Sequence, residues 1–142
     1  MTGHTQFTEI DEAAIRTLVE TFYARVMEDP DLSRPFERTI GPVGAPAWRE
    51  HFDTLSDFWS SVMLKTGRYH GNPMGKHARV EGIKPGLFQI WLRLFDRTAA
   101  ELFVEPIAAE FSSRAHRIAQ SLQLGLFFRP ERPAGNRQAP AG

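Results

Sequence analysis

The amino-acid sequence predicts an all-α protein with a single domain. Apolar residues recur at helical spacing in four long segments, and clusters of proline and glycine separate these segments. No segment alternates polar and apolar residues for long enough to predict a strand. The 142 residues suffice for one hydrophobic core but not for two.

Composition excludes several classes of function. The formal net charge is +0, so no long-range field would attract nucleic acid or an anionic membrane. The chain has no cysteine, which removes disulfides, thiolate catalysis, cysteine-bound zinc and iron–sulfur clusters. No apolar run approaches the ~18 residues of a membrane span, and the N-terminus lacks a secretory pattern. We therefore expect a cytoplasmic protein.

The first helix is expected to follow a flexible lead-in over residues 1–10. Asp11 suits the N-cap, and the apolar periodicity continues to about Glu28, just before Pro30. Tyr23 lies on the buried stripe of this helix. Its hydroxyl either bonds a backbone carbonyl in an ordinary core or points into a ligand cavity.

A second region, 31–65, combines a broken segment with a long helix. Proline and glycine limit its first part to a turn of helix around Leu32–Phe36, with Phe36 as an apolar plug. Pro46 then begins a helix that runs to about Lys65. His51 lies on the apolar face of this helix, where it is either a core histidine or a functional group.

The connector after this helix leads to a short helix that carries His77. Glycines and Pro73 interrupt residues 66–75, and we expect Tyr69 and His70 to be surface residues. Pro73 can begin a very short helix that ends near His77, before a second break at Gly82.

Two further helices complete the predicted domain, which covers residues 11–128. The first begins at Pro85, continues to about Phe103, is apolar on most faces and carries Trp91 on its inward face. The second begins near Glu105. Residues 129–142 are rich in proline, glycine and alanine, and we expect a disordered tail.

The inward-facing polar side chains indicate one kind of chemistry. The chain has no phosphate-binding glycine motif, no HExxH and no GxSxG. Tyr23, His51 and Trp91 each come from a different helix, and His77 comes from a fourth segment. One imidazole is too little for zinc, but it is enough for haem, whose porphyrin supplies four nitrogen ligands.

Five segments of the sequence resemble those of group III truncated haemoglobins. They are FYARV around Tyr23, DLSRPF ending at Phe36, WREHFDTLSDFW around His51, GNPMGKH ending at His77, and FQIWLRLF around Trp91. The similarity extends over residues 15–126, and the order and spacing of the segments carry it.

The resemblance implies a two-over-two helical sandwich around haem b, with His77 as the iron ligand. It places Tyr23, His51 and Trp91 on the distal side of the haem. It also implies haem contacts by Phe36, Leu55, Phe58, Met74, Val80, Ile83, Phe88 and Ile118. Lys76 and Arg79 either neutralise the haem propionates or are ordinary solvated charges.

These residues predict reversible binding of O₂, CO or NO. The Tyr23 O–H and the Trp91 N–H are two donors for a polar ligand, and together they would slow its escape on the order of 100-fold. Such retention fits tight O₂ binding, or redox chemistry on NO or peroxide, better than simple transport. No flavin or nicotinamide motif is present, so a reductase would be a separate protein. The alternative is a cofactor-free helical module that binds a partner protein.

Overall fold

The computed structural model describes residues 5–80 and 82–127 of the chain. Six helices form this part of the molecule, which confirms the all-α prediction. They are α1 (Glu12–Val26), α2 (Ser33–Thr39), α3 (Pro46–Leu64), α4 (Pro73–Ala78), α5 (Pro85–Leu102) and α6 (Glu105–Phe127). The tail predicted over residues 129–142 lies outside the described residues.

Local sequence signals set most of the helix boundaries. The Asp11 carboxylate accepts a hydrogen bond from the Ala14 N–H at 2.8 Å and caps α1. Proline occupies the first turn of α3, α4 and α5, where its missing N–H costs nothing. The predicted end of α1 at Glu28 is wrong by two residues: the N–H groups of Glu28 and Asp29 bond three residues back, which tightens the chain into a turn after Val26.

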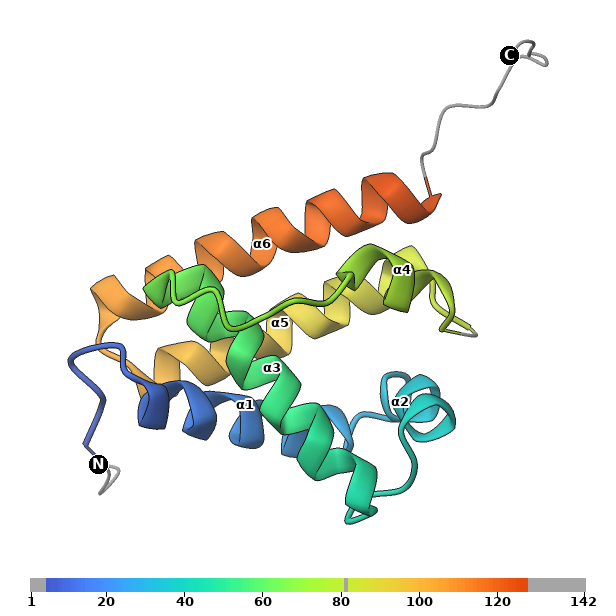
Figure 1. Cartoon of the computed structure of the whole chain (residues 1–142), viewed down its shortest axis with the longest axis horizontal. Coiled ribbons are helices and arrows are strands. Elements are labelled where there is room, and N and C mark those ends of the chain that lie inside the picture. The colour runs from blue at the N-terminus through green and yellow to red at the C-terminus, as the bar shows by residue number, and fades with distance from the viewer. Residues whose placement is uncertain (1–4, 81, 128–142) are drawn as a thin grey trace, which may run out of the picture.

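The long helices form two pairs that pack on each other (Figure 1). Helices α5 and α6 run antiparallel, while α3 crosses in front of α1 and α5. The interhelical contacts join α5 to α6, α1 to α3 and α1 to α5. Helix α5 thus touches both α1 and α6, as its apolar faces predicted. None of the helices in residues 5–80 and 82–127 is long and apolar enough to span a membrane.

Aromatic side chains fill the centre of this sandwich. Phe22, Phe95, Phe103 and Phe111 are fully buried. The Phe95 ring lies between two tryptophans, with ring centroids 5.2 Å from Trp59 and 5.2 Å from Trp91. This stack links α3, through Trp59, to the face of α5 that carries Phe95 and Trp91.

Part of the N-terminal lead-in is tied to the far end of the sandwich. The Phe7 N–H donates to the Leu102 carbonyl at 2.8 Å, and the Phe7 carbonyl accepts from the Val104 N–H at 3.0 Å. The expectation of a flexible lead-in therefore does not describe Phe7, because two backbone hydrogen bonds hold it to the α5–α6 junction. Such long-range pairing leaves no periodic signal in a single sequence.

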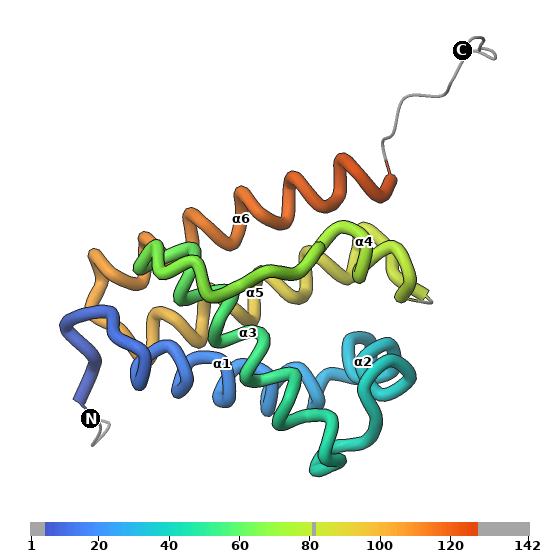
Figure 2. The backbone as a smooth tube through the Cα atoms, in the orientation of Figure 1, coloured from blue at the N-terminus to red at the C-terminus, as the bar shows by residue number. Residues whose placement is uncertain are grey.

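The connector between α3 and α4 crosses the molecule without helical structure (Figure 2). Its beginning is fastened by the buried Ser60 hydroxyl, which lies 2.8 Å from both the Glu12 carboxylate and the Thr66 hydroxyl. Further along, the Tyr69 N–H donates to the Ser61 hydroxyl at 2.9 Å. These contacts deliver the chain to Pro73, where α4 begins.

Candidate functional site

A cavity of about 440 Å³ lies within the helical sandwich. This volume is in the range of small-molecule and cofactor sites. All six helices contribute to its wall, which is mostly aliphatic and aromatic. Of the residues predicted to bind haem or its ligands, the lining includes Tyr23, Phe36, His51, Leu55, Phe58, Lys76, His77, Val80, Ile83, Phe88, Trp91 and Ile118.

His77 reaches the cavity from the short helix α4. Its Nδ1 lies 2.7 Å from the Pro73 carbonyl oxygen. Because a carbonyl can only accept a hydrogen bond, Nδ1 carries the proton and donates it. Nε2 therefore keeps its lone pair and can coordinate a metal, in the arrangement that commonly orients ligating histidines. Phe88 supports the imidazole, with ring centroids 6.4 Å apart.

Tyr23 and Trp91 meet on another wall of the cavity. The Trp91 indole N–H donates to the Tyr23 hydroxyl oxygen in a long hydrogen bond of 3.4 Å. Burial raises the Tyr23 pKa to about 12, although the bond from Trp91 opposes this shift. The phenol is thus neutral near pH 7. No acceptor for its O–H is found among the described residues, so this proton can be donated into the cavity.

His51 points inward from α3 into a cluster of aromatic rings. Its ring centroid lies 5.5 Å from Tyr23, 6.3 Å from Phe36 and 5.3 Å from Trp48. Burial is the main cause that lowers the His51 pKa to about 4, and the nearby Lys76 ammonium, together with His77 in its protonated form, lowers it further. Its Nε2 is buried without a hydrogen-bond partner among the described residues. A neutral imidazole with a free nitrogen is thus held at the cavity wall.

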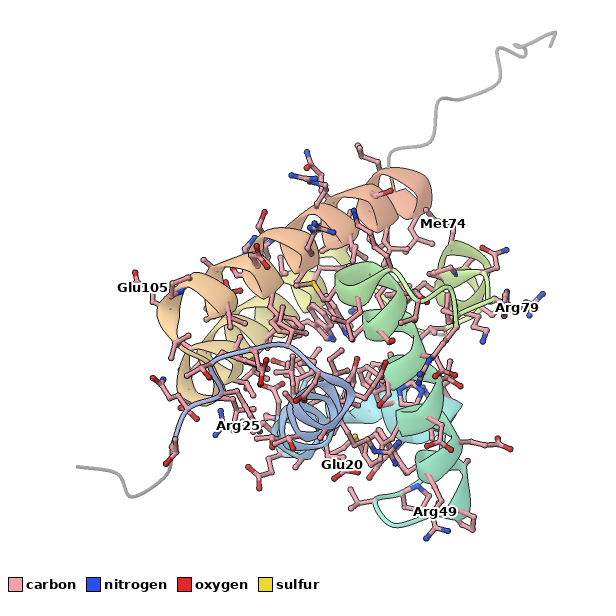
Figure 3. All side chains as sticks on the ribbon, turned by 60° about the vertical axis from the view of Figure 1, so that its left-hand side comes forward. Glu20, Arg25, Arg49, Met74, Arg79 and Glu105 are labelled. Atoms are coloured by element: carbon pink, nitrogen blue, oxygen red, sulfur yellow. The ribbon has the colours of Figure 1, made fainter. Side chains whose placement is uncertain are left out.

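The mouth of the cavity carries opposite charges. Glu50 and Lys76 both line it, and both are exposed to solvent. Arg79 is also exposed but lies outside the lining, and Figure 3 shows it directed away from α4. Met74 is likewise outside the lining and lies between α4 and the end of α6 (Figure 3). The structure therefore does not bring these last two predicted haem contacts into the cavity wall.

The prediction that Tyr69 is a surface residue is wrong. Its side chain is half-buried, lines the cavity and packs edge-on against Phe58 with ring centroids 5.2 Å apart. Burial raises its pKa. The nearby Gly71 is the one feature of the local sequence that fits this inward position of Tyr69, because a Cβ at residue 71 would overlap the Tyr69 ring. Neighbouring His70 is exposed, as predicted.

The protein groups alone do not form a metal site. Among residues 5–80 and 82–127, no three histidine, aspartate or glutamate side chains gather closely enough to hold an ion. A metal bound by His77 would need most of its ligands from another molecule. The apolar walls and the two imidazoles at the cavity, those of His51 and His77, fit a flat, largely apolar metal complex better than a free ion.

Comparison with known proteins identifies the family. The chain matches none of the known family models. It is 32% identical over 122 residues to the group 3 truncated hemoglobin ctb of Campylobacter jejuni, a match that spans 86% of this chain and 95% of the relative. The crystal structure of the group III truncated hemoglobin from Campylobacter jejuni superimposes with a TM-score of 0.83 at 30% identity, covering 89% of this chain and all of that one. With the helical sandwich and its cavity, these matches show that the chain belongs to the group III truncated haemoglobins.

Proposed function

We propose that the cavity holds haem b and that His77 Nε2 is the protein group that would bind its iron. The hydrogen bond from Nδ1 to the Pro73 carbonyl is the observation that carries this proposal. It fixes the tautomer that exposes Nε2 and makes the imidazole a stronger donor to a metal. The family relationship and the apolar lining support the same cofactor.

The residues around the cavity would have two roles: apolar side chains would pack against the porphyrin, and a cationic side chain would neutralise a propionate. Phe36, Leu55, Phe58 and Phe88 would contact the porphyrin faces and edges, since they line the same cavity. Lys76 at the mouth would neutralise a propionate. The Tyr69 O–H would be a further hydrogen-bond donor at the cavity wall, because the Tyr69 ring also lines the cavity.

Bound haem would supply an open coordination position for a diatomic ligand such as O₂, CO or NO. The Tyr23 O–H would then donate a hydrogen bond to that ligand. The Trp91 N–H donates to the Tyr23 oxygen rather than standing free. We therefore propose a relay, in which Trp91 orients and polarises Tyr23 while Tyr23 makes the direct contact.

Such a pocket would favour retention of a polar ligand. A hydrogen bond to an acceptor carrying negative charge contributes roughly 1.5–3 kcal/mol, which corresponds to about 10-fold to 100-fold slower escape. We propose tight, reversible O₂ binding as the basic activity. Redox chemistry on NO or peroxide fits the same donors, and a separate reductase would renew the ferrous state.

Reconstitution with haemin tests the cofactor assignment. The purified full-length chain is mixed with haemin, desalted, reduced with dithionite and exposed to CO. We expect an intense Soret band that remains with the protein and shifts on CO binding. A chain that stays colourless after desalting would overturn the proposal and favour a cofactor-free helical module.

A further inference from the structure

The short helix α4 packs chiefly against α6. None of its residues is fully buried, and α6 is its main partner among the long helices. Within α4, the Asn72 side chain accepts the Gly75 N–H at 3.1 Å and caps the helix. This cap stabilises α4 internally but does not determine where the helix lies relative to the cavity.

Met74 connects α4 to the end of α6. It lies three residues before His77, so the two side chains leave neighbouring faces of one helix. His77 faces the cavity, whereas Met74 lies against α6 (Figure 3). A Cβ built on Gly125 would lie only 2.6 Å from the Met74 sulfur and closer still to its terminal methyl carbon. Gly125 therefore leaves a notch that the Met74 thioether fills.

The glycine in this notch is not explained by backbone conformation. Gly125 is absent from the residues of positive φ, and it lies inside the last turn of α6. Glycine weakens a helix at such a position relative to alanine. Gly86 in α5 provides the contrast, because a Cβ there would meet nothing within 4 Å. Close packing against Met74 is the feature that distinguishes Gly125.

We infer that Gly125 and Met74 are positioning residues that set the distance between α4 and α6 and thereby the position of the His77 imidazole. This inference rests on the proposed function, in which His77 binds the haem iron. The same end of α6 also reaches His77 through two rings, since Phe127 packs on Phe88 with centroids 6.0 Å apart and Phe88 packs on His77. A methyl group at Gly125 would displace the Met74 thioether from the notch and so remove this contact between α4 and α6.

The test compares Gly125→Ala with the matched variant Gly86→Ala in haem-loaded full-length protein. The readouts are the iron–histidine stretching band of the ferrous form, the rate of haem transfer to an apoglobin acceptor, and amide exchange in α4. We expect Gly125→Ala to shift or broaden the band, to speed haem loss several-fold and to speed exchange in α4. Gly86→Ala should leave all three unchanged.

A double-mutant cycle separates this contact from a general weakening of α6. In a Met74→Ala background, adding Gly125→Ala should cause no further shift of the band, because the methyl group then enters empty space. An unchanged band in Gly125→Ala, or an equal shift in the Met74→Ala background, would overturn the inference. Failure of the proposed function would differ, because the unsubstituted protein would then retain no haem.

Discussion

The two walls of the cavity are built in different ways. Tyr23 and Trp91 lie on long helices, and the residues that pack against them, such as Phe22 and Phe95, are fully buried aromatic side chains. His77 belongs to a six-residue helix without a buried residue. It is oriented by one backbone hydrogen bond and positioned from outside by Met74.

This difference indicates which polar groups must be held in a defined direction on each side of the cavity. On the Tyr23 side, dense packing fixes the direction of two polar groups in an apolar environment, where misplacement leaves them unpaired. On the His77 side, one nitrogen must face the cavity, and a single hydrogen bond within α4 orients its ring while the contact with α6 sets its position. The substitutions below test this contrast, beginning with the largest expected effect.

Replacing His77 by alanine removes the proposed iron ligand. We expect His77→Ala to lose most haem after desalting, and added imidazole to restore the Soret band in part. His70→Ala is the matched control, because His70 is an exposed histidine on the connector that leads to α4. Native haem retention and an unchanged ferrous spectrum in His77→Ala would show that another group binds the iron.

Phe95→Ala tests how strongly the opposite wall depends on packing. The ring is buried between Trp59 and Trp91, so its removal opens a cavity and should lower the free energy of unfolding by about 3–5 kcal/mol. Urea unfolding followed by circular dichroism measures this loss. Phe7→Ala, at a half-buried ring, should cost distinctly less. Equal losses would show that the rings around Phe95 are packed no more tightly than those at a half-buried position.

Tyr23→Phe tests the relay while preserving the shape of the side chain. Losing the O–H should raise the O₂ dissociation rate about 10-fold to 100-fold, from roughly 1.5–3 kcal/mol of lost hydrogen bonding. Trp91→Phe should give a smaller increase, because its N–H acts through Tyr23. Stopped-flow displacement of O₂ by CO measures both rates.

Tyr69→Phe is the control for this experiment, because it also removes a tyrosine hydroxyl, but from another part of the cavity wall. It should leave O₂ dissociation near the rate of the unsubstituted protein. A larger effect of Trp91→Phe than of Tyr23→Phe would contradict the relay. It would instead assign the direct contact to the indole.

The lowered pKa of His51 should make the free energy of unfolding depend on pH. Its pKa falls from 6.5 to about 4 on folding, so the unfolded chain takes up a proton at higher pH than the folded chain does. Its stabilising contribution is complete above pH 6.5 and is lost as the pH falls toward 4. This contribution changes by at most ~1.4 kcal/mol per pH unit, the value for one proton.

His51→Gln should therefore flatten the dependence of unfolding free energy on pH between about 6.5 and 4. Denaturant unfolding at several pH values measures the slope. His70→Gln, at an exposed side chain, should retain the original slope. Retention of that slope by His51→Gln would show that His51 does not remain neutral inside the fold.

Local sequence signals predict the helices and most of the residues that face the cavity. Proline at the first turn of three helices and the Asp11 cap are local signals, and they act within a few residues along the chain. Apolar periodicity likewise placed Tyr23, His51 and Trp91 on inward faces. These properties depend on neighbours within one helix, so they can be predicted without knowing how the helices pack.

How those residues meet depends on the packing of helices that are distant in the sequence. The bond from Trp91 to Tyr23 joins residues 68 positions apart, and the notch at Gly125 accepts Met74 from a different helix. The connector brings Tyr69 into the wall without any periodic pattern. Such contacts depend on the distance between whole helices, which the total packing of the core sets and no local segment encodes.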